Sequence, residues 1–326
     1  MKKLRQEFAD TMLEIGEKDE NLVVMVGDIS HGILKPFAEK YPNRYYNIGI
    51  CEAAMVNLAA GLSKVGLTPV VHTIAPFIIE RAYEQIKLDF GYQQQQINLI
   101  SVGSAFDYAQ LGCSHHCYTD VSLISHLKDS CVFCPGSAVE FNTLFKQSYQ
   151  NGKINYFRLT ENPHEVNIVD SIEVGKAIHI RSGIDLTLVT TGAQLKNALL
   201  ACNEIKEKGF SVDLIYLPTI KPFPVDDIVR SLRTTRKLLT VEELSAHDGL
   251  FSQCLKASIG IELIKAEQLA IEDFIYGYGD YKEICSRTGL NSKNIVNKAT
   301  SLILEKNDYF RHSQQPCKNS QESPTQ

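Results

Sequence analysis

Short apolar runs alternate with amphipathic segments along most of the chain. In the first half, mostly apolar runs predict strands at residues 22–26, 69–74, 97–102, 132–135 and 155–159, and a further short strand that ends at Gly49. Between them, apolar positions at helical spacing predict helices over residues 6–18, 53–64, 79–90 and 139–150. Strands and helices in alternation are typical of a mostly parallel sheet with helices on both faces.

The pattern lapses into a polar linker with Pro163 and then restarts. The second half has predicted strands at residues 186–191, 212–217, 237–241 and 270–275, separated by helices such as residues 194–208. From about residue 307 the chain is polar and rich in Gln, Ser and Pro, so we expect disorder there. The expected fold class is α/β, with two doubly wound, mostly parallel-sheet domains in tandem over residues 1–165 and 172–306, and a disordered tail over 307–326.

Composition narrows the class of protein. With 326 residues, 44% of them hydrophobic and 22% charged, the chain is long enough to bury two cores. A net charge of -5 gives no support for binding to nucleic acid or to an anionic membrane. No apolar run approaches the length of a membrane span, and the amino-terminal residues lack the apolar core of a secretion signal. We therefore expect a cytoplasmic protein.

A group of cysteines and histidines could be a metal site. Its members are Cys113, His115, His116, Cys117, Cys131 and Cys134. Cys131 and Cys134 lie in a run that predicts a strand, where residues three apart point to opposite faces and cannot chelate one ion. The nine cysteines are scattered and odd in number, which favours reduced thiols. We expect no metal ligands in this chain.

A lone carboxylate stands at the start of a helix that must be buried on most sides. Residues 46–62 read Tyr-Asn-Ile-Gly-Ile-Cys-Glu-Ala-Ala-Met-Val-Asn-Leu-Ala-Ala-Gly-Leu, and Glu52 is the charged residue in this run. A buried carboxylate without a partner costs on the order of several kcal/mol. Glu52 therefore either caps the helix or accepts a hydrogen bond from a ligand, and the residues alone leave both interpretations open.

This run, continued by Gly-Leu-Thr-Pro at residues 66–69, resembles the pyrimidine-binding domain of transketolases and 1-deoxyxylulose-5-phosphate synthases. Residues 192–193, 217–222 and 240–249 resemble the C-terminal domain of the same family, so the resemblance covers nearly the whole chain apart from the tail. In that family the glutamate that matches Glu52 hydrogen-bonds the aminopyrimidine ring of thiamine diphosphate. The resemblance thus implies that Glu52 is both catalytic and cofactor-binding.

Three further residues match positions near the family's cofactor. Phe77, at the end of Thr-Ile-Ala-Pro-Phe, matches the aromatic residue that stacks on the aminopyrimidine, although the chain has one residue more between Phe77 and Arg81 than the synthases have. Asp28, in Gly-Asp-Ile-Ser, matches an aspartate near the cofactor site. His115 matches a substrate-facing histidine in the family's Gly-x-Thr-His-Gln stretch, and an imidazole there can move a proton near neutral pH. The adjacent His116 is expected to have a structural role.

Two arginines match positions that bind a substrate phosphate in the family. Arg158 follows an apolar strand, and Arg5 lies where a second such arginine is often found. A guanidinium group suits bidentate recognition of phosphate. The chain departs from the sugar-using members at Leu111, where they have an aspartate that contacts a hydroxyl of the donor. This departure leaves open a donor other than an ordinary ketose phosphate.

One family motif is missing from the sequence. In this family a separate domain with Gly-Asp-Gly and a downstream Asn supplies the oxygen ligands of the divalent cation that holds the diphosphate. No Gly-Asp-Gly occurs here. The resemblance therefore implies the C-terminal subunit of a split enzyme, with Mg²⁺ or a similar cation ligated by an N-terminal partner subunit that carries Gly-Asp-Gly. We expect an α2β2 hetero-oligomer that self-associates through this chain.

The implied activity is the transfer of a two-carbon ketol unit from a ketose or ketose phosphate to an aldehyde. Two alternatives stay open. One is a decarboxylating relative, either the beta subunit of a 2-oxo acid dehydrogenase or an enzyme like deoxyxylulose-phosphate synthase. The other is a non-catalytic assembly subunit, against which the joint presence of Glu52, Phe77 and His115 argues.

Overall fold

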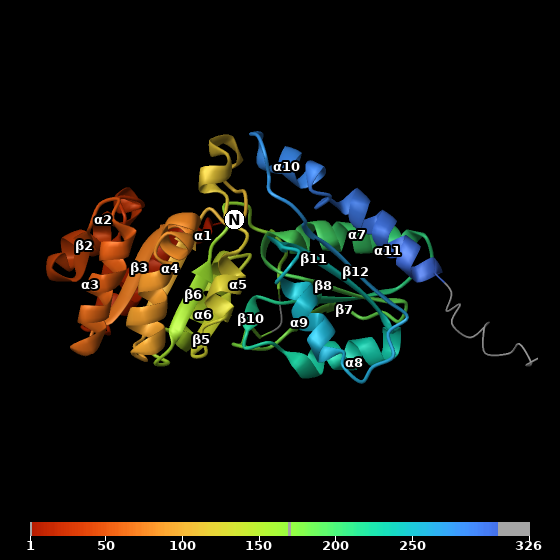
Figure 1. The fold of residues 1–326 in the computed structure, drawn as a ribbon, viewed down its shortest axis with the longest axis horizontal. Helices are drawn as coiled ribbons and strands as arrows, with labels where there is room; N and C mark the ends of the chain where they lie inside the picture. Colours follow the sequence, from red (N-terminus) through yellow and green to blue (C-terminus); the bar gives the residue numbers. More distant parts are fainter. Residues whose placement is uncertain (1, 169–170, 306–326) are drawn as a thin grey trace, which may run out of the picture.

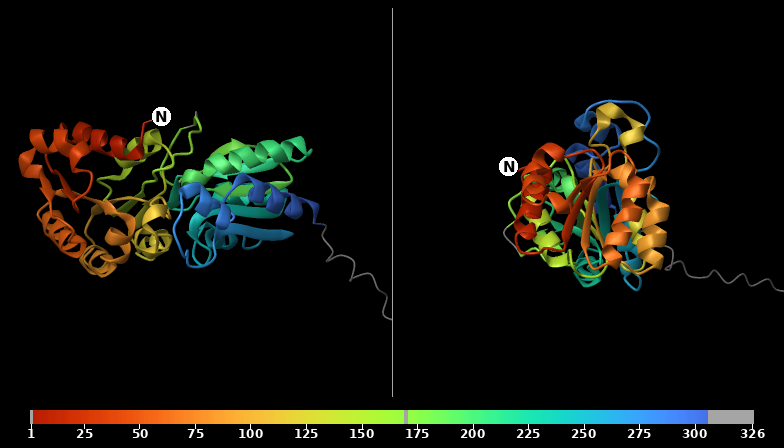
Figure 2. Two further views of the ribbon diagram at one scale, coloured as in Figure 1. Left: turned by 90° about the horizontal axis from the view of Figure 1, so that it is seen from above. Right: turned by 90° about the vertical axis from the view of Figure 1, so that its left-hand side faces the viewer.

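The chain folds into two sheets that lie side by side along its long axis (Figures 1 and 2). This architecture is given by a computed structural model that describes residues 2–168 and 171–305. Both sheets are mostly parallel and have helices on both faces, which confirms the predicted α/β class with two sheets in tandem. The tail predicted to be disordered lies outside the described residues.

The first sheet has seven strands in the order β10-β5-β6-β4-β3-β1-β2. Their bounds are β1 (Leu22–Val26), β2 (Tyr45–Asn47), β3 (Thr68–Ile74), β4 (Ile97–Val102), β5 (Ser130–Phe133), β6 (Ile154–Arg158) and β10 (Thr219–Lys221). All pairings are parallel except that of β10 with β5. Every residue of β1, β4, β5 and β6 is buried, which explains why these strands are mostly apolar.

Helices cover both faces of this sheet. Alternation along β1 divides its side chains between two core clusters, with Val24 in one and Val23 in the other. The cluster of Val24 includes residues of α1 (Leu4–Gly16), α2 (His31–Lys40) and α6 (Ala138–Ser148). The cluster of Val23 includes residues of α3 (Glu52–Lys64), α5 (Asp120–Ser125) and the helical segment around α4 (Tyr83–Gln85). The sheet is therefore buried on both sides.

The second sheet has five strands in the order β12-β11-β8-β9-β7. Their bounds are β7 (Ile178–Arg181), β8 (Leu186–Thr190), β9 (Val212–Tyr216), β11 (Lys237–Ser245) and β12 (Lys265–Ile271). One face is covered by α7 (Leu195–Glu207) and α11 (Ser292–Leu304), and the other by α8 (Val225–Thr235) and α9 (Leu250–Ala257), as Figure 1 shows. The short helix α10 (Tyr281–Arg287) precedes α11.

Two expectations for individual elements were wrong, and two strands were not predicted. The last strand is Lys265–Ile271 instead of residues 270–275, because an edge strand tolerates polar residues such as Glu267. The antiparallel strands β7 and β10 were not predicted, since both are short and carry basic residues. The helix expected over residues 79–90 consists of two π-helical segments, Pro76–Glu80 and Ile86–Tyr92, on either side of α4.

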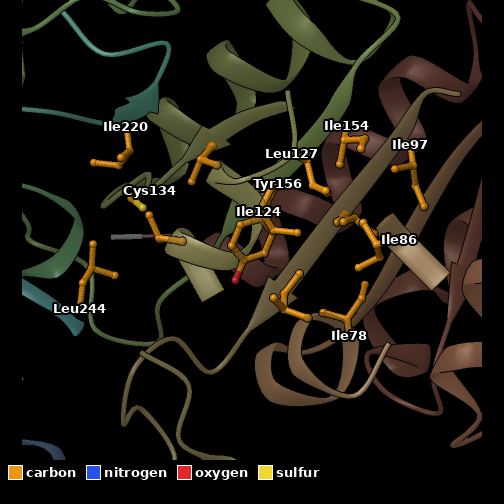
Figure 3. Packing of buried hydrophobic residues seen from close by; sticks show 14 of the residues in the cluster. Ile78, Ile86, Ile97, Ile124, Leu127, Cys134, Ile154, Tyr156, Ile220 and Leu244 are labelled. Carbon is orange, nitrogen blue, oxygen red and sulfur yellow. The ribbon is translucent and has the colours of Figure 1, made fainter. Parts of the chain in front are cut away.

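The two halves share one apolar core. Strand β10 comes from the second half of the sequence and extends the first sheet through the pairing Thr219↔Phe133. Figure 3 shows Ile220 and Leu244 in the same cluster of apolar side chains as Cys134 and Tyr156 of the first sheet. The position of the second sheet relative to the first is thus fixed by burial of apolar surface.

A buried polar triad adds to this junction. Glu140 of α6 accepts hydrogen bonds from the Tyr216 hydroxyl of β9 and the Gly136 amide, at 2.6 and 2.8 Å. The Nε2 atom of His164 lies 2.6 Å from the other Glu140 oxygen. Because the three side chains are fully buried, these bonds form in a medium of low polarity and hold the two halves in register.

None of the helices in residues 2–168 and 171–305 is long and apolar enough to cross a membrane.

Candidate active site

Candidate residues gather where parallel strands of the first sheet end. Asp28 follows β1, Phe77 follows β3, and the segment with His115 follows β4. Glu52 begins α3, the helix that connects β2 to β3. Because the carboxyl ends of parallel strands share one edge of a sheet, ligands of open α/β sheets bind there.

Glu52 is buried and only half satisfied. Its side chain is 1% exposed, and its Oε2 atom accepts a hydrogen bond of 2.8 Å from Nη1 of Arg81. Its Oε1 atom has no hydrogen-bond partner among the residues that the structure describes. A Cβ atom on Gly27 would lie 3.5 Å from Oε1 and 3.0 Å from Thr73 Oγ1, so glycine leaves room at this point. The backbone amides of α3 do not bind the carboxylate, so the contacts favour the ligand-binding interpretation over the capping one.

A π-helical turn brings Phe77 and Arg81 together. The amide of Arg81 donates to the carbonyl of Pro76, five residues earlier, at 3.0 Å. This wide turn accommodates the additional residue between Phe77 and Arg81, and such turns are frequent at functional sites. The centre of the Arg81 guanidinium lies 4.2 Å from the centroid of the Phe77 ring, within the range of a cation–π contact.

His115 completes the group from the loop after β4. It lies in the turn Cys113–His115, with its ring centroid 5.2 Å from that of Phe77 at an interplanar angle of 71°. Tyr108 approaches His115 with a centroid distance of 6.3 Å. Burial, and to a smaller extent the charge of Arg81, lower the pKa of His115 and so favour its neutral imidazole. We call Glu52, Phe77, Arg81, Tyr108 and His115 the Glu52 cluster.

The loop that carries His115 is held by the second half of the chain. An antiparallel bridge pairs Ala105 with Cys117 at its base. Gly112, with φ of 73°, packs so closely on Tyr278 that a Cβ atom there would lie 2.6 Å from the ring. His116 is buried, and neither ring nitrogen has a partner in residues 2–168 and 171–305. The structural role expected for His116 stays a prediction.

Asp28 is exposed, and its hydrogen bonds join it to Asn47, which is not a member of the Glu52 cluster. Its backbone has φ of 53°, and its amide donates to Asn47 Oδ1 at 3.0 Å. Asn47 in turn donates to Asp28 Oδ1 at 3.1 Å. These reciprocal bonds hold the left-handed conformation at Asp28, one residue from Gly27. The cofactor-binding role of Asp28 stays a prediction.

Arg5 is positioned by a buried relay. Its Nε atom donates to Ser30 Oγ at 2.8 Å, and Ser30 Oγ lies 2.7 Å from His72 Nε2. The Nδ1 atom of His72 lies 2.8 Å from the carbonyl of Ile100, which can only accept, so Nδ1 carries the proton and Ser30 donates to Nε2. Arg5 stays partly exposed, and its Nη1 atom is 3.6 Å from Glu161 Oε1. The relay leaves its guanidinium edge available for an anion, and the phosphate-binding role stays a prediction.

The His72 relay makes stability depend on pH. Burial lowers the pKa of His72 from 6.5 to about 3. The hydrogen bond with the Ile100 carbonyl raises this pKa, but its effect is smaller. The unfolded chain takes up a proton on His72 below pH 6.5 and the folded chain does not, so stability is lost as the pH falls. Between pH 6.5 and 5, we expect the free energy of unfolding to fall by about 1.6 kcal/mol more in the wild type than in His72→Gln. Urea unfolding at both pH values measures this difference. The control His31→Gln, at an exposed site, should keep the pH dependence of the wild type. An equal dependence of stability on pH in all three proteins would contradict the assignment of the effect to His72.

Arg158 differs from the expected phosphate ligand. Its side chain is 6% exposed, and its Nε atom donates to Asp120 Oδ2 at 2.8 Å. Its Nη2 atom donates to the carbonyls of Cys117 and Glu243, both at 3.1 Å. These contacts tie β6 to the His115 loop and to β11, and they favour a structural role. Binding of substrate by Arg158 stays a prediction that its burial disfavours.

Several residues of the site could not be assigned from the sequence. Arg81 and Tyr108 lacked a role, although the spacing of four residues from Phe77 to Arg81 on a helix was a signal for contact. Leu111 is 52% exposed. The nearby Asp107 does not replace the family's aspartate, because its two oxygens already accept hydrogen bonds from Ser104, Thr160, Asn162 and the Glu161 amide. Within the described residues, no group of three or more His, Cys, Asp or Glu side chains is arranged to hold a metal ion.

Comparison with known proteins agrees with the two-sheet architecture. The family profile described as transketolase, pyrimidine binding domain, matches residues 1–164, and the one described as transketolase, C-terminal domain, matches residues 175–295. The chain is 28% identical, over 93% of its length and 95% of the relative, to the 6-deoxy-6-sulfo-D-fructose transketolase subunit SqwH of Clostridium sp. (strain MSTE9). It is 27% identical, over 92% of its length and 97% of the relative, to one subunit of the apulose-4-phosphate transketolase of Phocaeicola vulgatus.

Longer relatives and a solved structure extend the comparison. The 1-deoxy-D-xylulose-5-phosphate synthase of Desulfotalea psychrophila is 26% identical over 92% of the chain, which spans 48% of that enzyme. A solved structure described as a split gene transketolase, inactive beta4 tetramer, superposes with a TM-score of 0.84 at 25% identity, covering 92% of this chain and 98% of the other. On these matches and the fold that carries them, the chain belongs to the transketolase family, with the pyrimidine-binding and C-terminal domains of that family.

Proposed function

We propose that this chain is the C-terminal subunit of a split, thiamine-diphosphate-dependent transketolase. It would help to move a two-carbon ketol unit from a ketose or ketose phosphate to an aldehyde. The observation that carries the proposal is the buried Oε1 atom of Glu52, which has no partner in the described residues and lies in the same cluster as the Phe77 ring. The family membership and the names of the relatives as transketolase subunits support it.

The Glu52 cluster fits an aminopyrimidine ring. Such a ring offers a nitrogen for a hydrogen bond with Glu52 Oε1 and a flat face for Phe77. When bound, thiamine diphosphate supplies a carbon nucleophile that stores the electron pair of the broken bond. Glu52 would hold and return a proton at Oε1, and Phe77 would fix the plane of the ring.

The diphosphate and its cation are assigned to a second subunit. We propose an N-terminal subunit with Gly-Asp-Gly that ligates Mg²⁺, joined to this chain in an α2β2 assembly. Two facts support this assignment. Two relatives that match over nearly their full length are named as transketolase subunits, and a solved split-gene transketolase is described as inactive in its beta4 form.

His115 is proposed to donate to the oxygen that becomes charged in the transition state. Its neutral imidazole can donate one proton, and Phe77 and Tyr108 fix the orientation of the ring. We expect His115→Asn to lower kcat of the assembled enzyme about 10²-fold, within the range for one positioned acid–base group. Steady-state kinetics test this, with the exposed His126→Asn as the matched control. An unchanged kcat in His115→Asn would remove His115 from the mechanism.

The reaction class is tested by its products. A ketol transfer from a ketose phosphate releases no carbon dioxide, whereas a decarboxylating relative releases one molecule for each 2-oxo acid consumed. Exposed Leu111, in place of the family's aspartate, makes the second class a specific alternative. Assays of the assembled enzyme with each donor, with carbon dioxide and aldehyde both quantified, separate the two. Carbon dioxide as the product of turnover would contradict the transketolase assignment.

A further inference from the structure

The guanidinium of Arg81 contacts the same two side chains, Glu52 and Phe77, that the proposed function gives to the aminopyrimidine. Its Nη1 atom donates to Glu52 Oε2 at 2.8 Å, and its centre lies 4.2 Å from the Phe77 centroid. A guanidinium group is planar, carries hydrogen-bond donors at its edge and stacks on aromatic rings. It thus shares the flat shape and the edge donors of an aminopyrimidine. The His115 ring also contacts Phe77, in a T-shaped arrangement with the ring centroids 5.2 Å apart.

We propose that Arg81 is a gate that closes the pyrimidine site of this chain before the cofactor binds. The proposal rests on the proposed function, because it takes Glu52 and Phe77 as the pyrimidine ligands. In the closed state Arg81 covers Phe77 and holds one oxygen of Glu52, so the buried carboxylate has a counter-ion while the site is idle. The ring of the cofactor can lie on the face of Phe77 that Arg81 covers only after the guanidinium has left.

The structure gives Arg81 room to leave. Its side chain is 48% exposed, whereas that of Glu52 is 1% exposed, so the arginine can swing into solvent while the carboxylate stays fixed. The backbone at Arg81 belongs to the end of a π-helical turn, which is less regular than an α-helix. A partly exposed ion pair and a single cation–π contact are individually weak, so the closed state is readily opened.

If Arg81 closes the site in most molecules, the apparent affinity for thiamine diphosphate is reduced to the fraction of molecules in which the site is open. We therefore expect Arg81→Gln to lower the apparent Kd of thiamine diphosphate about five- to tenfold, the range that these two contacts allow. The gain should lie in the association rate, because the variant needs no opening step. Electrostatic attraction of the diphosphate predicts the opposite, since the variant has lost a positive charge near the site. Arg81→Lys keeps the charge but lacks the planar fork, so it should bind with an intermediate Kd.

The test is calorimetry and stopped-flow binding of thiamine diphosphate with Mg²⁺ to the assembled complex of this chain and its diphosphate-binding partner. Arg233→Gln on α8, at an exposed position, is the control for the loss of one positive charge and should bind as the wild type does. Thermal unfolding of each variant verifies that it is folded.

The outcomes separate the gate from the proposed function. Tighter and faster binding by Arg81→Gln alone supports the gate. Equal binding by Arg81→Gln and the wild type overturns the gate and leaves the proposed function intact, and weaker binding overturns it by making Arg81 a ligand of the cofactor. If no variant binds, the wild type included, the proposed function fails and the gate fails with it.

Discussion

Glu52→Gln is expected to lower kcat of the assembled enzyme by about 10²- to 10⁴-fold, the range for loss of a positioned proton-transfer group. Glutamine has the shape of glutamate and can still accept from Arg81, but it cannot take up and return a proton at the position of Oε1. Because the substitution removes a buried charge without creating a cavity, the unfolding temperature should change little. Steady-state kinetics and thermal unfolding of the same preparation measure both effects.

The matched control is Glu84→Gln, which makes the same chemical change at an exposed residue of α4. It should leave kcat at the wild-type value. Near-normal turnover in Glu52→Gln would remove Glu52 from the mechanism. A large fall in unfolding temperature would show instead that the carboxylate is structural.

Asp120→Asn is expected to destabilise the chain by about 3–5 kcal/mol, the cost of breaking a buried ion pair by removing one partner. Asp120 is fully buried and accepts from Arg158 Nε at 2.8 Å and from the Tyr156 hydroxyl at 2.5 Å. Asparagine leaves the guanidinium of Arg158 charged and buried without its counter-ion. The loss should appear as a lower midpoint in urea unfolding.

An exposed ion pair provides the comparison. Arg236 and Glu262 are joined at 2.8 Å, with Glu262 71% exposed. Glu262→Gln should cost less than about 1 kcal/mol, as exposed pairs do. Equal costs for Asp120→Asn and Glu262→Gln would contradict the structural role given to the Asp120–Arg158 pair.

The sequence predicted correctly those strands whose residues are buried on both faces of the sheet. Strands such as β1 and β4 lie inside the sheet between two helical layers, so a mostly apolar run marks them. The errors lie at edges, where strands are short or partly polar. Strand β12 carries Lys265 and Glu267 at an edge, and β10 crosses from the second half to pair with β5, a contact that no local pattern signals.

The site was only partly accessible from the sequence for a different reason. Glu52 was conspicuous because a charged residue interrupts an apolar helix, and this signal needs no tertiary information. The role of Arg81 depends on a π-helical turn, and that of Arg158 depends on a buried partner 38 residues away. Neither the turn nor the partner follows from residue spacing. The family match to Arg158 therefore suggested a ligand where the contacts favour a structural cation.

The most direct test of the account is calorimetric binding of thiamine diphosphate with Mg²⁺, first to this chain alone and then to the chain mixed with a partner subunit that carries Gly-Asp-Gly. A site divided between two subunits predicts tight binding in the mixture and none to the chain alone. This chain would supply Glu52 and Phe77 for the pyrimidine, and the partner would supply the cation ligands. Tight binding to the chain alone would contradict the division of the site between two subunits.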